Sequence, residues 1–306
     1  MTDYLIFDIG GTNLKYALLN NAGKIKEKGK QATVKTNLED FMQQIYGIAD
    51  AYLGRFQGIS LAIPGKIDVE QKIVHFGGSL PFLDGANMQK LLGGKYHVPV
   101  GVENDGKAAA LAEMWLGALK DVNAGEMLTL GSEVGGGIVV NGQLIHGTHF
   151  QAGELSFMRY DPACKDWSGF TGQIGSAVNM IKRVNEAIGN SDLNDGLAAF
   201  KAINSGDEKA VQIFTEYCRH VANIILSVQA VVDGERIVIA GGISEQPVVI
   251  KTISKEYDKL AKQFYRVGHE LTKPEIVPAK FKNDANIYGA LYALLLELNG
   301  EGNDAK

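Results

Sequence analysis

The chain of 306 residues contains little cysteine, little proline and no long hydrophobic run. Its two cysteines, Cys164 and Cys218, cannot build a disulfide framework or the paired CxxC groups of a structural zinc site, so a reducing cytoplasm is expected. The 7 prolines are too few for a collagen-like or low-complexity chain. The longest uncharged apolar stretch, from Val221 to Val232, falls well short of the ~20 residues that span a bilayer.

An excess of positive charge is also missing, because the formal net charge is −5. This balance gives no electrostatic footprint for nucleic acid or for an anionic membrane. The N-terminal residues reach Asp3 and Asp8 without a basic region followed by an apolar one, so no signal peptide is expected. We therefore expect a cytoplasmic protein whose partners are small or neutral molecules.

Glycine, in contrast, is abundant: 37 of 306 residues, about 12%, against a typical usage near 7%. Two glycine-rich segments, 8–12 and 131–137, each lie between two short apolar runs, which predicts a turn joining two strands. Glycine allows successive backbone N–H groups to surround an anion such as phosphate. Neither segment is a Walker A loop or a GxGxxG motif opening a helix, which weighs against P-loop and Rossmann folds.

The remaining pattern predicts two copies of one α/β topology with a cleft between two lobes. Residues 1–118, joined by a terminal helix over 286–300, form the first predicted lobe, and residues 119–285 form the second. Predicted strands cover 24–30, 59–63, 98–102, 127–130, 138–140, 143–145, 236–240 and 275–277, and predicted helices follow Asn37 and cover 106–116, 171–187, 207–231, 246–265 and 286–298. Gly93 and Gly94 are expected to form a tight turn or a bulge.

Six motifs together resemble the ROK family of bacterial sugar kinases, in order and spacing, over essentially the whole chain. They are Asp8-Ile-Gly-Gly-Thr12, Pro64-Gly65, Glu103-Asn104-Asp105, the glycine run at 131–137, Ala152-Gly153-Glu154 and Ala240-Gly241-Gly242. The resemblance implies an actin-like ATPase (ribonuclease H-like) duplicated fold. It also implies an ATP- and Mg²⁺-dependent kinase that phosphorylates a primary (O6) hydroxyl of a hexose or hexoside, and a homodimer.

The resemblance also implies which residues hold the nucleotide. They are Asp8, Gly10, Gly11, Thr12, Asn13, Ser132, Gly135, Gly136, Gly137, Gly241 and Gly242. Among them Asp8 would hold Mg²⁺ through water, since an ionised carboxylate is an acceptor only. Gly241 and Gly242 could instead form a simple strand-to-helix turn.

On the sugar side, Asp105 is the candidate catalytic base. Its place at a helix start favours the ionised form that accepts a proton, although aspartate is also a common helix-start residue. The resemblance places further substrate contacts at Pro64, Gly65, Ser79, Asn104, Glu154 and Phe157. Asn104 and Glu154 would bind hydroxyl groups, while a surface turn is the alternative role for Glu154.

One departure from the family pattern concerns metal and substrate. The family commonly continues with Gly-His and a CxCGxxGCxE zinc motif, where this chain has Leu155-Ser156-Phe157 and a single cysteine, so no structural zinc is expected. Phe157, Trp167 and Phe170 stand in the replaced region and favour a substituted anomeric carbon, as in a β-glucoside such as cellobiose. The aromatic residues could instead be core. A kinase acting on free glucose, mannose, fructose or N-acetylmannosamine therefore stays open.

A second departure is Glu133, where the family usually has glycine. A left-handed backbone there would be strained, and a carboxylate facing phosphate would repel it. A non-catalytic sugar-binding sensor with the same fold is the corresponding alternative, although Asp8 and Asp105 are both present.

Overall fold

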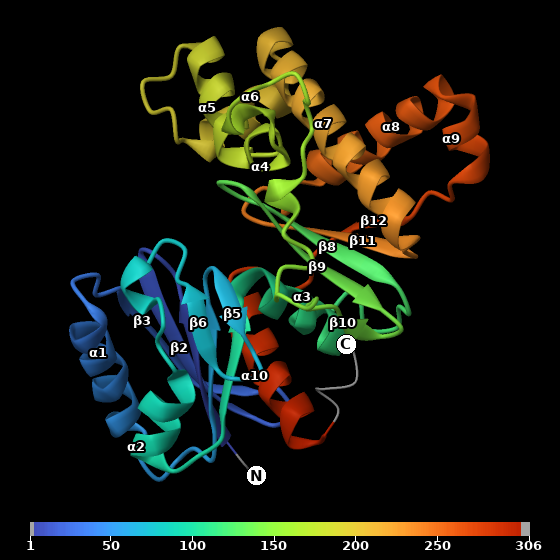
Figure 1. Cartoon of the computed structure of the whole chain (residues 1–306). Helices are drawn as coiled ribbons and strands as arrows, with labels where there is room; N and C mark the ends of the chain where they lie inside the picture. The colour runs from blue at the N-terminus through green and yellow to red at the C-terminus, as the bar shows by residue number, and fades with distance from the viewer. Residues whose placement is uncertain (1–2, 301–306) are drawn as a thin grey trace. The chain divides into compact units, whose positions relative to one another are not determined.

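The computed structural model describes residues 3–300. Its contacts divide the chain into two compact units, which are coloured by residue number in Figure 1. The first comprises Met1–Lys120, Leu144–Ala152 and Asn283–Lys306, and the second comprises Asp121–Gln143 and Gly153–Lys282. Three separate segments of the chain therefore make up the first unit.

The first unit is built on a five-stranded mixed sheet of order β3-β2-β1-β4-β7. Its strands are β1 (Asp3–Ile9), β2 (Asn13–Asn20), β3 (Ile25–Ala32), β4 (Ile59–Ile63) and β7 (Val100–Asn104). The first three form an antiparallel meander, and β1, β4 and β7 are parallel. Strand β7 begins two residues later than the predicted 98–102 and runs into Asn104.

Alternation along β1 explains the two layers of helices on this sheet, because successive side chains of a strand point to opposite faces. Leu5 and Phe7 belong to the core that includes helix α1 (Leu38–Ala51), whose predicted N-cap Asn37 accepts from Asp40 N. Tyr4 and Ile6 pack in the core of helix α10 (Ala285–Leu298) on the other face. Helix α10 lies beside α3 (Asp105–Leu116) in Figure 1.

The second unit repeats this plan with a sheet of order β10-β9-β8-β11-β12. Its strands are β8 (Gly125–Leu130), β9 (Val134–Val140), β10 (Gln143–Leu144), β11 (Arg236–Ala240) and β12 (Glu275–Pro278). An antiparallel hairpin again precedes parallel strands, and Asn141 and Gly142 form the β9–β10 turn with φ of 54° and 70°. The predicted duplication of one topology is therefore confirmed.

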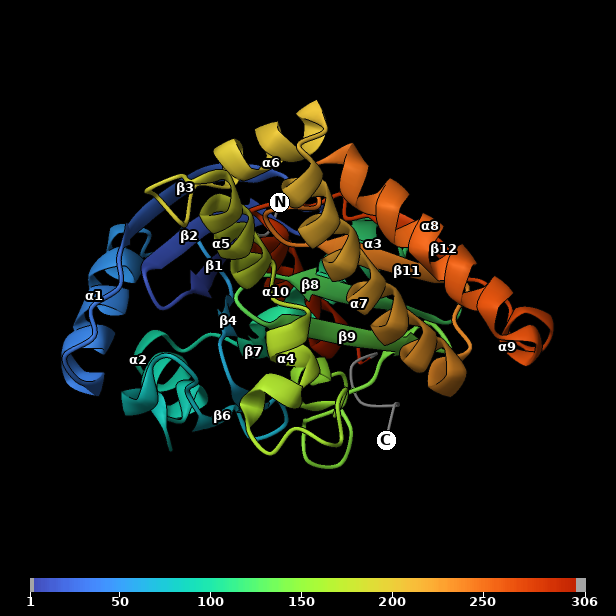
Figure 2. The same ribbon diagram turned by 90° about the horizontal axis from the view of Figure 1, so that it is seen from above.

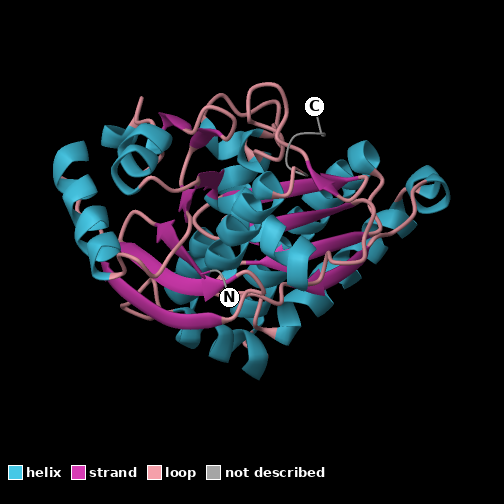
Figure 3. Ribbon diagram, turned by 90° about the horizontal axis from the view of Figure 1, so that it is seen from below, coloured by secondary structure: helices cyan, strands magenta, loops and turns pink. Residues whose placement is uncertain are grey.

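Long helices provide most of the second core. They are α5 (Ala177–Ile188), α6 (Gly196–Ser205), α7 (Glu208–Val232) and α8 (Pro247–Gln263), and α6 was not predicted. Asp207 caps α7 by accepting from Ala210 N, which explains where this helix begins. Figure 2 shows α7 and α8 running side by side, and Figure 3 shows helices packed along the strands of both sheets.

The other described elements are short. They are β5 (Lys66–Asp68), β6 (Ile73–Phe76), the single-turn segments η1 (Pro81–Leu83), η2 (Gln89–Gly93), η3 (Leu155–Phe157) and η4 (Trp167–Gly169), and helices α2 (Gly94–Tyr96), α4 (Thr171–Ile174) and α9 (Tyr265–Glu270). Gly93 and Gly94 have helical φ of −63° and −64°, so the tight turn or bulge predicted there is wrong. None of the helices over residues 3–300 is both long and apolar enough to cross a membrane.

Candidate functional site

Three parallel strands of the first unit end at one edge of its sheet, and Asp8, Gly65 and Asp105 lie at those ends. Asp8 pairs with Ala62 across β1 and β4, and Ile63 pairs with Asn104 across β4 and β7. The segments that follow Ile63 and Asn104 therefore start beside each other. The carboxyl edge of parallel strands is where α/β proteins commonly bind ligands.

Asp8 is 5% exposed, and both of its carboxylate oxygens have partners. Lys15 Nζ lies 2.9 Å from Oδ2, and Asn286 Nδ2 donates to Oδ1 at 2.9 Å. Each oxygen keeps a further lone pair, which can accept a hydrogen bond from a metal-bound water. The donor set therefore fits a water-mediated Mg²⁺.

The first glycine turn is closely packed. Gly10 N donates to Asn13 O at 3.0 Å, while Gly10 O accepts from Thr33 Oγ1 at 2.6 Å. A Cβ on Gly11 would lie 2.7 Å from Ser79 Oγ, so a side chain at this position would have to displace the Ser79 hydroxyl. This packing brings Ser79, predicted for the sugar, against the turn predicted for phosphate.

Pro64-Gly65 and Asn104 are joined directly, because Asn104 Nδ2 donates to Gly65 O at 2.8 Å. Gly65 has φ of +95°, and a Cβ there would lie 2.0 Å from Phe76 O, so only glycine fits. Asn104 Oδ1 also accepts from Lys107 N at 3.1 Å as the N-cap of α3. Asn104 therefore has a structural role in addition to the sugar contact predicted for it.

Asp105 is the first residue of α3 and is half-buried. Its Oδ1 accepts from Gly106 N at 2.8 Å. The positive end of the helix dipole favours a negatively charged carboxylate at this position. The structure therefore places the candidate base at the sheet edge that also carries Asp8 and Gly65.

In the second unit the glycine turn is shorter than predicted. The turn consists of Gly131, Ser132 and Glu133, while Gly135 to Gly137 lie inside β9 and pair with Thr129 to Met127. A Cβ on Gly136 would lie 2.7 Å from Gly153 O and 2.8 Å from Leu155 Cδ1. This glycine thus allows the segment containing Glu154 to pack against the strand.

Gly241 and Gly242 follow β11 and differ in environment. Gly241 has φ of +100°, and its Cβ would lie 2.1 Å from Leu130 O at the end of β8. A Cβ on Gly242 would meet nothing within 4 Å. The pair therefore lies at the carboxyl edge of the second sheet, with open space beside Gly242.

The segment after Glu154 is fixed to β9 and presents an aromatic group. Ser156 is buried, and its Oγ exchanges hydrogen bonds with Val134 N and O, each 3.0 Å long. Phe157 is 62% exposed, with its ring centroid 5.6 Å from that of Trp167. Trp167 stacks on Phe170 at 4.6 Å. We call Phe157, Trp167 and Phe170 the aromatic cluster.

Glu133 contacts this cluster, since Trp167 Nε1 donates to its Oε1 at 3.3 Å. Glu133 is not among the described residues with positive φ, so the strain considered for a left-handed backbone is absent. Its side chain is exposed. The unexpected glutamate therefore links the second glycine turn to Trp167.

The region of the family's zinc motif contains Cys164, whose Sγ lies 3.0 Å from Ser168 Oγ and 3.3 Å from Asp166 Oδ1. Throughout residues 3–300, no group of three or more His, Cys, Asp and Glu side chains is arranged to hold a metal ion. Absence of structural zinc stays a prediction for metal analysis.

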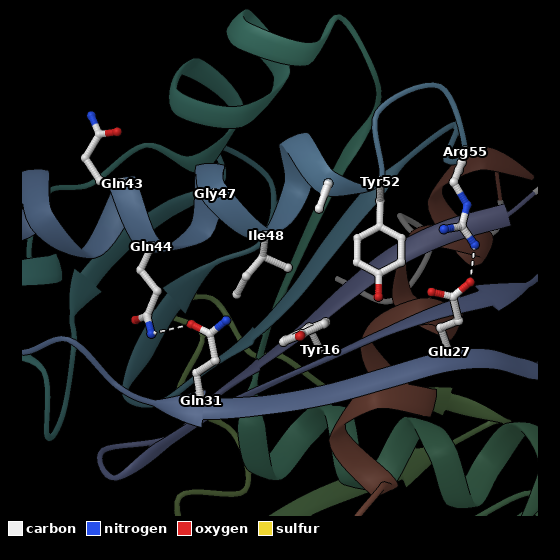
Figure 4. Close-up of a pocket in the computed structure, with 10 residues that line it drawn as sticks. Tyr16, Glu27, Gln31, Gln43, Gln44, Gly47, Ile48, Tyr52 and Arg55 are labelled. Carbon is white, nitrogen blue, oxygen red and sulfur yellow. Dashed lines mark hydrogen bonds and ion pairs between the residues drawn. The ribbon is translucent and has the colours of Figure 1, made fainter.

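A cavity of about 500 Å³ lies elsewhere in the first unit, between α1 and the strands β2 and β3 (Figure 4). Glu27 and Arg55 form an ion pair at one end, and Gln44 Nε2 donates to Gln31 Oε1 at 3.1 Å at the other. None of its lining residues is a predicted site residue.

Several contacts at the site have no signal in the sequence. Lys15 and Asn286 reach Asp8 from seven and 278 positions away, and His146 Nε2 lies 2.7 Å from Glu103 Oε2. Only the pairing of Lys15 with Asp8 across the β1–β2 hairpin could have suggested the first of these.

Comparison with known proteins supports the resemblance to the ROK family over most of the chain. The model of the ROK family matches residues 4–297. A beta-glucoside kinase of Listeria monocytogenes is 28% identical over 299 residues, covering 96% of this chain and 97% of the relative. A glucokinase of Halalkalibacterium halodurans is 28% identical over 333 residues, covering 99% of this chain and 98% of the relative.

Among solved structures, a ROK family protein from Streptococcus pneumoniae in complex with sucrose superposes with a TM-score of 0.87. It is 26% identical, and the match covers 98% of this chain and 100% of that one. The chain therefore belongs to the ROK family and has the actin-like ATPase fold of the family's sugar kinases.

Proposed function

We propose that this member of the ROK family is an ATP-dependent carbohydrate kinase that phosphorylates the O6 hydroxyl of a β-glucoside such as cellobiose. The kinase part is supported by the family and by relatives that are named as kinases acting on sugars. The observation that carries it is the position of Asp105 in the first turn of α3, beside Asn104 and at the edge that bears Asp8 and Gly65.

In the proposed reaction, Asp105 accepts the proton of the O6 hydroxyl as that oxygen bonds to the γ-phosphorus of ATP. The bond from phosphorus to the bridging oxygen breaks, and ADP leaves. The amides of Gly11 and Thr12 are the proposed donors to phosphate, because Gly10 N already donates within the turn. Mg²⁺, when bound, neutralises phosphate charge.

Further nucleotide contacts proposed from the family resemblance are Asn13, Ser132, the glycines at 135–137 and Gly241-Gly242. The open space beside Gly242 is consistent with a ligand there, whereas Gly136 is also required by packing. Ser79, Asn104, Glu154 and Phe157 are the proposed sugar contacts. A homodimer in the cytoplasm, which the resemblance also implies, is testable by light scattering and by fractionation.

The preference for a β-glucoside rests on the aromatic cluster. Aromatic faces bind the apolar faces of sugar rings and aryl groups, and Phe157 is largely exposed beside Glu154. An aglycone or second sugar on the anomeric carbon would gain this contact, whereas a free anomeric hydroxyl would not. A glucokinase is the second candidate, because the Halalkalibacterium glucokinase is as similar as the beta-glucoside kinase.

The test is a comparison of kcat/KM for ADP release with cellobiose, an aryl β-glucoside, glucose, mannose, fructose and N-acetylmannosamine. We expect the two glucosides to be preferred, with ³¹P NMR identifying a 6-phosphate. A preference for glucose would favour the second candidate. No transfer to any sugar would support a non-catalytic sensor.

A further inference from the structure

The segment Leu144–Ala152 packs with the first unit, although the chain on both sides of it belongs to the second. Two of its groups contact the end of β7 and the start of α3. His146 Nε2 lies 2.7 Å from Glu103 Oε2, and Lys107 Nζ donates to Phe150 O at 3.3 Å. Ala152 N donates to His146 O at 3.0 Å and closes the segment on itself. The sequence motifs assign no role to His146.

Glu103 connects His146 to the residues that precede the helix. It is 2% exposed, and its Oε1 accepts from Asn104 N at 2.8 Å, while Oε2 contacts His146. Both carboxylate oxygens are thus held. Asn104 in turn caps α3 and binds Gly65 O. A shift of Glu103 would therefore move Asn104 and the next residue, Asp105.

The charges that face His146 come from three places. Glu103 lies on β7, Lys107 lies on α3 and is 1% exposed, and Glu70 lies in the segment between β5 and β6. Burial lowers the pKa of His146, but the charge and hydrogen bond of Glu103 outweigh it, with Glu70 adding to Glu103 and Lys107 opposing it. The net result is a pKa raised above the ordinary histidine value of 6.5.

We propose that His146 is a positioning residue for phosphoryl transfer, which holds Glu103 and through it sets Asn104 and Asp105 in place for the sugar hydroxyl. The role of Asp105 in this inference rests on the proposed function, whereas the His146–Glu103 pair does not. Displacement of a reacting group by about 1 Å can cost as much as ~100-fold in rate.

The pair predicts a specific pH dependence. Below its ordinary pKa, His146 is charged and attracts Glu103. As pH rises through the raised pKa, His146 loses its charge and this attraction is lost. Loss of the charge loosens Glu103, so kcat falls at alkaline pH. A general base acts in the opposite direction, because its proton-accepting form becomes more available as pH rises.

The variants separate these effects. His146→Ala removes the contact, and His146→Gln retains an N–H donor without a titrating group. We expect kcat of His146→Ala to fall on the order of tenfold with KM for ATP nearly unchanged. We expect His146→Gln, which donates without a charge, to show a kcat between that of His146→Ala and that of the wild type at neutral pH, with no alkaline fall. His149→Gln, at an exposed histidine of the same segment, is the matched control and should keep the wild-type profile.

A second readout needs no activity. The ring resonances of His146 in the NMR spectrum of the full chain should titrate above pH 6.5, and this pKa should drop in Glu103→Gln. An unchanged alkaline limb in His146→Gln, or a His146 pKa insensitive to Glu103→Gln, would overturn the inference. If the NMR titration behaves as expected but no sugar is phosphorylated, the proposed function fails and the pair stands without a catalytic role.

Discussion

Replacing Gly289 by alanine should destabilise the protein and displace the helix that begins with Asp105. Gly289 lies in α10 where this helix crosses α3, and an added Cβ would be 1.6 Å from Ala108 O and 2.3 Å from Ala108 C. Non-bonded heavy atoms are most stable about 3.5–4 Å apart. The contact is backbone on the α3 side, so no side chain can rotate away, and the two helices must separate.

The magnitude follows from two opposing effects. Overpacking of a close-packed interior costs typically 1–3 kcal/mol, and a clash with backbone belongs at the upper end, about 3 kcal/mol. Alanine in place of glycine within a helix is favourable by about 1 kcal/mol. The net loss is therefore about 2 kcal/mol, which lowers Tm by roughly 3 °C for cooperative unfolding of 306 residues at about 2.1 cal/mol/K per residue.

Thermal unfolding by circular dichroism measures the change, and Gly47→Ala is a matched control. Gly47 lies inside α1, is exposed, and its Cβ would meet nothing within 4 Å. That variant should be stabilised by about 0.5–1 kcal/mol. If Gly289→Ala melted at or above the wild-type temperature while Gly47→Ala behaved as expected, the inferred close contact between α10 and α3 would be refuted. The kcat of Gly289→Ala should fall as well, since α3 carries Asp105.

Two further predictions concern the second unit. Glu126 is fully buried with no hydrogen-bond partner for either carboxylate oxygen among the described residues, and burial, reinforced by the charge of Asp233, raises its pKa from 4.5 to about 7. Stability should therefore fall as pH rises from 4.5 through 7, and urea unfolding of Glu126→Gln should lack that dependence; an equal fall in both proteins would refute the assignment. Trp167→Ala, which removes the centre of the aromatic cluster, should raise KM for an aryl β-glucoside about tenfold with little change for glucose. Equal changes for both sugars would show that the cluster does not contact the substituent.

The duplicated topology could be predicted because its signals are local. Apolar runs that end in glycine turns predict strand pairs, and Asn37 followed by Phe41, Ile45 and Ile48 predicts a helix with a defined start. Helix α6 was not predicted, although Asp195 caps it by accepting from Leu197 N and Ala198 N. Gly93 and Gly94 continue a helical segment, because tertiary packing can override the turn preference of glycine.

The site could be predicted only as far as its residues follow strand ends. Asp8, Gly65 and Asp105 do so, and parallel neighbours bring them to one edge. The partners that hold them come from distant segments, as Asn286 holds Asp8 and His146 holds Glu103. The packing role of Gly136 could not be predicted either, because Gly153 and Leu155, which pack on it, are distant in the sequence.

The central claim is that Asp105 accepts the proton of the sugar hydroxyl. Its most direct test is ADP release by Asp105→Asn with the preferred sugar, alongside calorimetric binding of that sugar to the same variant. The account predicts a loss of turnover of at least about 100-fold, with sugar affinity largely retained. Turnover close to that of the wild type, with the sugar still bound, would contradict it.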